Sequence, residues 1–165
     1  MDGRQGLLTL STAHSESDER CLEVSRALGK RGLQTTITIT TDGAPGLINA
    51  TDALWLRSLR MRCWFHKMQK RHHKVPPQAW PACKALLADM REAPTFEEGQ
   101  RRRQPLLAQE QATFPEACRC LEEDAIARLN HLKVPARHRQ YVRTSNLAER
   151  AFEEERRRTK VIPHL

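Results

Sequence analysis

Two carboxylates stand where a metal-dependent phosphodiester-cutting site could use them. Asp42 follows an alternating Thr/Ile stretch and precedes Gly43, so we expect it at the carboxyl end of a strand. In open α/β sheets that edge collects ligands and active sites. Glu149 lies far along the chain, in a segment expected to open a helix. Two divalent metals held by clustered carboxylates can activate water and stabilise the oxygens around a reacting phosphorus.

Each of these carboxylates also has a purely structural interpretation. Asp-Gly is a routine turn dipeptide, which explains Asp42 without chemistry. With Asn146 as N-cap, Glu149 occupies the position that closes a capping box, worth about 1 kcal/mol. The local sequence alone favours these structural interpretations for both residues.

Cys63-x-x-His66 is the next group with chemical potential. A structural zinc site needs four ligands, and only His72 and His73 lie close in sequence. In a strand over 60–65, Cys63 and His66 would point to opposite faces unless the chain turns into a helix at His66. We therefore favour an orienting role near the active site over zinc binding. Cys118-x-Cys120 lacks the spacing of a zinc knuckle, and we interpret both as helix residues.

The composition indicates a basic intracellular chain. The net charge is +8 and the pI is about 9.7, which favours a polyanion such as nucleic acid or, alternatively, a solvated charged surface. The cysteine count of five is odd and shows no disulfide framework, which favours reduced thiols and a cytoplasmic location. No apolar run reaches the ~20 residues that span a bilayer, so we expect no membrane partner.

The hydrophobic pattern predicts an α/β frame with a helical interior. We expect strands at Leu7–Thr12, Gln34–Thr41 and Arg60–Phe65, and helices from Ser15 to about Lys30 and at Leu47–Leu56. Gly32 should end the first helix, whose buried stripe would be Cys21, Leu22, Val24 and Leu28. From Lys67 to Tyr141 the pattern becomes helical, with windows at 78–92, 96–110 and 116–130.

Charged residues mark two further places in the chain. Arg101-Arg102-Arg103 is either a solvated helix face or a DNA clamp, and the sequence leaves both open. The last expected element is a charged helix from Asn146 to about Lys160, with Glu153–Arg157 and Glu154–Arg158 in the favourable i,i+4 order.

Taken together, these segments resemble the Mutator-type transposases of bacterial insertion sequences. The resemblance covers essentially the whole chain. It rests on 2–4, 16–17 with 28–33, 41–47, 62–67, 93–94, 120–124 and 143–163, the last including Arg156-Arg157-Arg158-Thr159-Lys160-Val161-Ile162-Pro163.

The resemblance implies a ribonuclease H-like fold interrupted by an all-helical insertion, with an Asp-Asp-Glu triad that binds two Mg²⁺ or Mn²⁺ ions. Asp42 would be the second aspartate and Glu149 the glutamate, both catalytic and metal-binding. Cys63 and His66 match the Cys-x-x-His signature near the active site. Contacts to DNA are expected from Arg150, Arg156, Arg157, Arg158 and Lys160. The resemblance therefore favours catalytic roles for Asp42 and Glu149 over the turn and capping roles, because those structural roles do not explain why all the motifs occur in this order.

The sequence also departs from this pattern. Its start resembles the turn before the family's third strand, and Asp2 matches that turn rather than the first catalytic aspartate. The expected fold is therefore α/β and mostly helical: an incomplete ribonuclease H-like mixed sheet without its first two strands, truncated at both termini. We expect a partial core at 1–66, the helical insertion at 67–141 and a returning core helix at 142–165.

The expected function is that of a transposase segment acting on transposon ends and target DNA by metal-dependent strand cleavage and transfer. With two of the three triad carboxylates, this chain alone should be defective in strand cleavage. Its exposed strand edges should favour self-association or pairing with a full-length transposase. The alternative is a non-catalytic remnant, or a DNA-binding accessory that modulates full-length transposase.

Overall fold

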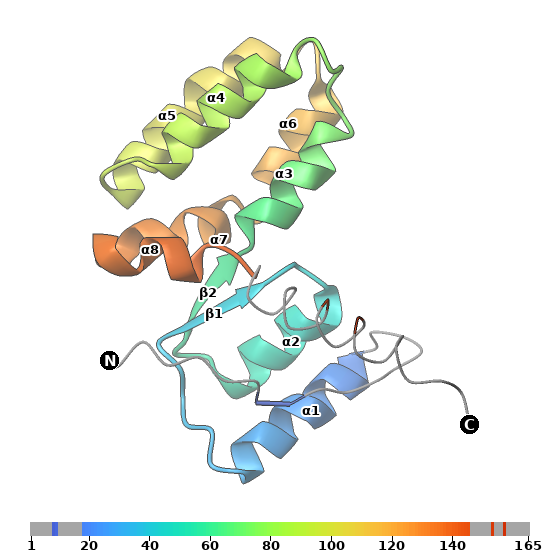
Figure 1. Ribbon diagram of the computed structural model, residues 1–165, viewed down its shortest axis with the longest axis vertical. Coiled ribbons are helices and arrows are strands. Elements are labelled where there is room, and N and C mark those ends of the chain that lie inside the picture. The colour runs from blue at the N-terminus through green and yellow to red at the C-terminus, as the bar shows by residue number, and fades with distance from the viewer. Residues whose placement is uncertain (1–7, 10–17, 146–152, 154–156, 158–165) are drawn as a thin grey trace, which may run out of the picture. The chain divides into compact units, whose positions relative to one another are not determined.

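The computed structural model describes residues 8–9, 18–145, 153 and 157 (Figure 1). The described chain is mostly helical and divides into two compact units. The first contains Met1–Ile37, Gly43–Ser58 and Ser145–Leu165, and the second contains Thr38–Asp42 and Leu59–Thr144.

The first unit is built on two packed helices, α1 (Asp18–Lys30) and α2 (Pro45–Leu54). The Asn49 amide links them by donating a 2.7 Å hydrogen bond to Asp18. As predicted, Gly32 ends α1: its φ is 95°, and the amide of Leu33 bonds to the carbonyl of Leu28 at 3.0 Å. This i to i−5 bond is typical of a Schellman motif, which favours glycine because the left-handed backbone strains other residues.

The second unit contains a two-stranded parallel sheet. β1 (Thr38–Thr41) pairs with β2 (Leu59–Arg62) in a register that runs from Thr38↔Leu59 to Thr41↔Arg62. The Asn130 amide donates to the carbonyl of Arg60 at 2.8 Å. This side chain satisfies a strand-edge acceptor that would otherwise need a third strand.

Helices make up the rest of the second unit. Their bounds are α3 (Trp64–His72), α4 (Trp80–Arg91), α5 (Phe96–Glu110), α6 (Pro115–Glu122), α7 (Ala125–Leu129), the 3₁₀ helix η1 (Asn130–Lys133) and α8 (Ala136–Val142). Proline begins α6, and the Thr95 hydroxyl caps α5 by accepting from the amide of Glu98 at 3.1 Å. Figure 1 shows α4 and α5 side by side, as their packing requires.

The core of this unit is apolar with a buried ion pair beside it. The main cluster comprises Trp64, Leu87, Met90, Ala93, Leu106, Leu121, Leu129 and Leu132. Arg71, only 2% exposed, pairs with Glu110 and donates to the carbonyl of Ala117 at 2.6 Å. Through Glu110 and the carbonyl of Ala117, Arg71 joins α3 to α5 and to the start of α6. Removing one partner of such a buried pair leaves an uncompensated charge, which is strongly destabilising.

Several sequence predictions are confirmed and others are wrong at their ends. The helical windows 78–92 and 96–110 are helices, and Cys118 and Cys120 lie buried within α6. The window 116–130 is not continuous, because Asp124 adopts a φ of 55° between α6 and α7. The strand predicted at 34–41 starts only at Thr38, and the helix predicted at 47–56 runs from Pro45 to Leu54.

The strand predicted at Arg60–Phe65 is wrong beyond Arg62. α3 begins at Trp64, because a helical turn there carries the indole into the apolar core. Of the segment Leu7–Thr12, the structure describes Leu8 and Thr9, and neither lies in a strand. The stripe Cys21, Leu22, Val24 and Leu28 is half-buried, whereas Ser25 between them is buried. Ser15 lies outside the described residues.

Other expectations concern the wider architecture. The parallel pair and the helical content agree with a mostly helical α/β chain, while the ribonuclease H-like topology and the three-part division remain predictions. None of the five cysteines, all of which are described, forms a disulfide. Among the helices in the described ranges, none combines the length and apolar character needed to cross a bilayer.

The contact of α5 with η1 yields a stability prediction. A Cβ at Gly99 would lie 2.7 Å from Leu132 Cδ1 and 3.1 Å from Leu129 Cδ2, both in the buried cluster. Gly99→Ala should therefore lower the free energy of unfolding, net about 1 kcal/mol, because overpacking exceeds the gain in helix propensity. Urea denaturation measures this. At Gly29, where a Cβ meets nothing within 4 Å, alanine should instead stabilise. Equal effects at the two positions would contradict the packing described here.

Candidate active site

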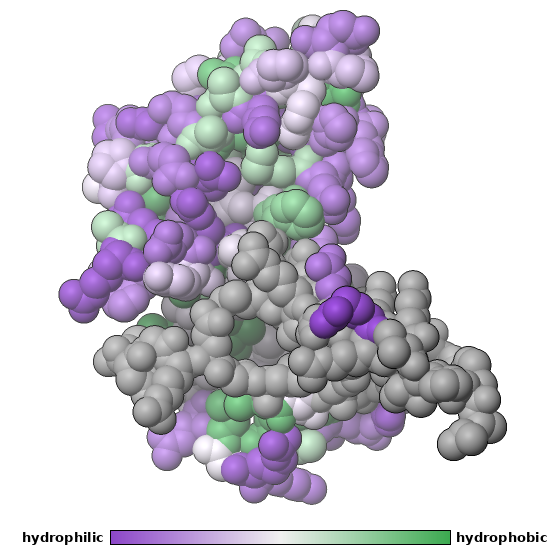
Figure 2. All heavy atoms as spheres, viewed as in Figure 1, coloured by the Kyte–Doolittle hydropathy of each residue, from purple (hydrophilic) through white to green (hydrophobic). Residues whose placement is uncertain are grey.

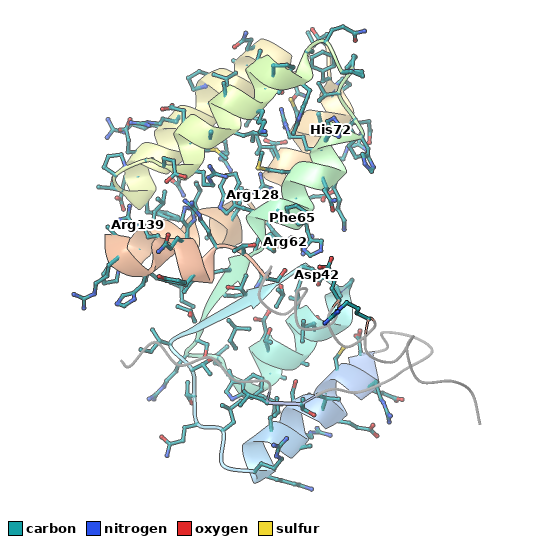
Figure 3. All side chains as sticks on the ribbon, in the orientation of Figure 1. Asp42, Arg62, Phe65, His72, Arg128 and Arg139 are labelled. Atoms are coloured by element: carbon teal, nitrogen blue, oxygen red, sulfur yellow. The ribbon has the colours of Figure 1, made fainter. Side chains whose placement is uncertain are left out.

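Asp42 lies at the carboxyl ends of the two parallel strands. The amide of Cys63 donates to the carbonyl of Thr41 at 2.8 Å, which continues the pairing one residue past the end of β2. Asp42 and Cys63 therefore sit at the same edge of the sheet. Figure 3 shows Asp42 and Arg62 at this end of the strands. The structure thus confirms the predicted strand-end position of Asp42, whose side chain is half-buried.

Cys63 is enclosed where β2 passes into α3. It is 0% exposed, and its Sγ lies 3.9 Å from Thr144 Oγ1. One residue on, the amide of Trp64 donates to the carbonyl of Arg143 at 2.9 Å. The segment Arg143–Thr144, distant in sequence, therefore returns to the strand-end edge that carries Asp42.

His66 is the third residue of α3 and is half-buried. His72 lies at the far end of that helix, where its ring is 4.7 Å from that of Trp80. In the described part of the chain, no group of three or more His, Cys, Asp or Glu side chains could hold a metal ion. The zinc interpretation of Cys63, His66, His72 and His73 therefore gains no support. Cys63 is instead placed to shape the edge by packing.

Arg62 and Asp124 had no role predicted from the sequence, and the structure brings them together. Arg62 is 3% exposed, and its Nε lies 3.7 Å from Asp124 Oδ2. The other oxygen of Asp124 lies 3.4 Å from Arg60 Nη1. Arg62 Nη1 is buried and has no hydrogen-bond partner in the described residues. One carboxylate thus anchors two arginines of β2, one of which ends the strand beside Asp42. Both residues fall within segments that carried the family resemblance.

Trp64 fixes the start of α3 to the helical core. Its Nε1 donates to the carbonyl of Arg128 at 3.0 Å and lies 3.3 Å from His131 Nδ1. His131 Nε2 lies 2.9 Å from the carbonyl of Arg91. His131 Nδ1 also lies 2.9 Å from the carbonyl of Arg128, so each ring nitrogen faces a carbonyl acceptor. Burial has the larger effect and lowers the pKa of His131, although the two carbonyls act in the opposite direction.

Arg128 closes the other side of the indole. Its guanidinium lies 5.8 Å from the centroid of the Trp64 ring and donates to the carbonyls of Cys120 and Glu123 at 3.1 and 2.9 Å. Burial lowers the pKa of Arg128 to about 10, so it remains a cation at neutral pH. Arg128, Trp64 and His131 therefore pack together next to the start of α3, which follows the strand end at Cys63.

Glu149, the second carboxylate expected from the sequence, lies outside the described residues. The same holds for four of the expected DNA-contacting residues, Arg150, Arg156, Arg158 and Lys160, whereas Arg157 is an exposed helical residue. Within the arginine triplet, Arg101 and Arg102 both pair with Glu98, and Arg102 also pairs with Asp89 at 2.7 Å. Those two arginines form an ion-paired helix face.

A comparison with protein families matches residues 1–165 to "Transposase, Mutator family". The chain belongs to this family. The Mutator-family chain is 29% identical over 160 residues to the transposase for insertion sequence element IS6120 of Mycolicibacterium smegmatis. The aligned region covers 97% of this chain and 50% of that relative. It is 30% identical over 159 residues to the transposase for IST2 of Acidithiobacillus ferrooxidans, covering 96% and 54%.

A third relative is the transposase for ISRM5 of Rhizobium meliloti, 24% identical over 98% of this chain and 40% of its own length. The Mutator-family chain thus spans about half the length of the curated relatives it matches. The resemblance drawn from the sequence motifs is confirmed at the level of the family.

The Arg62–Asp124 contact predicts a charge-specific loss of stability. Asp124→Asn keeps a side chain that tolerates the left-handed backbone but removes the charge opposite buried Arg62. The free energy of unfolding should fall by about 3 kcal/mol, because a buried guanidinium loses its partner. Chemical denaturation followed by circular dichroism measures this. Asp89→Asn, at an exposed pair with Arg102, is the control and should change stability by less than about 1 kcal/mol.

His131 predicts a dependence of stability on pH. The unfolded chain binds a proton near pH 6.5, whereas folded His131 has a lowered pKa, so protonation favours unfolding. Stability should be full above about pH 6.5 and fall by up to about 1.4 kcal/mol per pH unit below it. Denaturation between pH 5 and 8 tests this. The slope should shrink in His131→Gln but persist in His73→Gln, which changes an exposed histidine. An unchanged slope in His131→Gln would refute it.

Proposed function

We propose that this chain provides a catalytic-core segment of an insertion-sequence transposase, acting in end binding, metal-dependent strand cleavage and strand transfer. The observation that carries the proposal is the position of Asp42 at the carboxyl edge of a parallel strand pair, beside Cys63. A turn aspartate needs no such neighbour. The family match over the full sequence supplies the reaction class.

In this proposal Asp42 and Glu149 are the carboxylates of the site. Thr144 lies against Cys63, and five residues of chain lead from it to Glu149. Cys63 and His66 shape the site. Arg150 with Arg156, Arg157, Arg158 and Lys160 contacts the DNA backbone.

The donor chemistry fits Mg²⁺ or Mn²⁺. Asp42 offers hard carboxylate oxygens at a half-exposed edge, and Mg²⁺ usually keeps several waters and takes only one or two protein carboxylates. The enclosed thiol of Cys63 is a soft donor and suits neither ion. When bound, such an ion supplies Lewis-acid stabilisation and lowers the pKa of a coordinated water. Asp42 and Glu149 would hold and orient it against the phosphate.

The level of activity is part of the proposal. The resemblance assigns only two of the three triad carboxylates to this sequence, so metal affinity and cleavage by these 165 residues alone should be low. The net charge of +8 also suits a second candidate function, a DNA-binding accessory that joins full-length transposase in mixed assemblies. Both functions use DNA as the partner, and they differ in whether Asp42 matters for cleavage.

Replacing Asp42 tests the site with two readouts. Mn²⁺ titration followed by electron paramagnetic resonance should show weak binding that Asp42→Ala and Glu149→Gln each reduce at least tenfold, because each removes a hard ligand. Nicking of supercoiled plasmid in Mg²⁺ should be weak and should vanish in both variants.

Glu97→Gln changes an exposed carboxylate on α5 and serves as the matched control for both assays. Unchanged Mn²⁺ binding in Asp42→Ala would refute the proposed metal site. Intact metal binding without any nicking would favour the accessory function over the enzyme.

A further inference from the structure

A basic groove lies in the first unit, among α1, the following loop and the end of α2. It encloses about 700 Å³, and its lining includes Arg26, Lys30, Gln34, Thr35 and Trp55. None of the described residues that line it is a carboxylate. In Figure 2 the surface over the ends of α1 and α2 shows hydrophobic side chains bordered by hydrophilic ones. The groove therefore combines positive charge, hydrogen-bonding groups and apolar surface.

The two cations of the groove repel one another. Arg26 and Lys30 stand at i,i+4 on α1, where like charges destabilise a helix by a few tenths of a kcal/mol. Both are exposed, and neither forms a salt bridge with a described residue. Arg20 on the same helix, by contrast, pairs with Glu23 at 3.1 Å. Such unpaired cations at a groove are suited to an anionic ligand.

Trp55 adds a different kind of contact. It ends α2, where its backbone amide donates to the carbonyl of Thr51, and its side chain is half-buried. An indole beside two cations matches the pattern used for single-stranded nucleic acid, in which bases stack on aromatic rings while Lys or Arg contacts phosphate. Paired bases inside a duplex do not offer their faces, so this combination favours unpaired nucleotides.

We propose that the groove bounded by Arg26, Lys30 and Trp55 binds a short single-stranded DNA segment, with phosphates on the two cations and a base on the indole. The proposal rests on the proposed function as a transposase, since strand cleavage and transfer produce unpaired nucleotides. It adds a nucleic-acid surface in the unit that does not contain Asp42, Cys63 or His66.

Gly29 offers an informative substitution. It lines the groove within α1, and a Cβ there would meet nothing within 4 Å. Gly29→Glu and Gly29→Gln introduce side chains of nearly the same size, and both should raise helix stability relative to glycine. They differ only in the charge placed among Arg26, Lys30 and the bound phosphate.

The experiment measures fluorescence anisotropy of a labelled ten-nucleotide oligothymidylate with the whole chain. Arg26→Ala/Lys30→Ala should weaken binding roughly 25-fold at 0.1 M salt and reduce the log–log salt slope by about 1.4. Trp55→Ala should weaken it roughly 5- to 150-fold, and Trp55→Phe should recover much of the loss. Gly29→Glu should weaken binding far more than Gly29→Gln.

Arg20→Ala is the matched charge control on α1 and should bind nearly as wild type does. Urea denaturation of each variant excludes unfolding as the cause of a loss. Asp42→Ala should bind the oligonucleotide normally, while the groove variants should retain Mn²⁺ binding, so the two proposals fail separately. Equal losses in Arg20→Ala and Arg26→Ala/Lys30→Ala, or equal affinity for a ten-base-pair duplex with no effect of Trp55→Ala, would overturn the proposal.

Discussion

The packing of one indole, Trp64, connects the strand ends to the helical core. Trp64 directly follows Cys63, and its backbone amide donates to the carbonyl of Arg143. Its ring lies among the leucines of the core. Arg128 and His131 hold the ring edge by hydrogen bonds and a cation–π contact. A displacement of this ring would move the first turn of α3, and with it the position of Cys63 relative to Asp42.

Within the described residues the sheet has two strands, so its edges depend on side chains. Asn130 supplies the donor that a neighbouring strand would otherwise give to Arg60, and Asp124 forms an ion pair with each of the two arginines of β2. Asp124 precedes α7, and Asn130 begins η1. These helices therefore help to stabilise the strand pair, although they follow β2 by some sixty residues of sequence.

Periodicity was enough to predict most helices, and turn chemistry was enough to place Asp42. The end of the strand at Asp-Gly has a local cause, because Gly43, which follows Asp42, has a φ of 93°. The boundary at Trp64 could not be predicted in this way. Its neighbours Arg62-Cys63-Trp64-Phe65 fit a strand locally, and only burial of the indole in a distant core selects the helix. Asp124 was missed for the same reason, because its left-handed backbone and its two arginine partners arise from tertiary contacts.

Arg128 has a consequence for how freely sequences of this family can diverge. Its hydrogen-bond acceptors are peptide carbonyls, at Cys120 and Glu123, and Arg139 likewise donates to the carbonyls of Val134, Ala93, Pro94 and Leu132. Every residue type carries a carbonyl, so these hydrogen bonds require the backbone path and no particular acceptor side chain; Ala93 and Leu132 are constrained separately, by burial in the core. The guanidinium itself is not exchangeable, since a lysine ammonium cannot reach several carbonyls in one plane. These hydrogen bonds would therefore tolerate a change at an acceptor position more readily than a change of either donor.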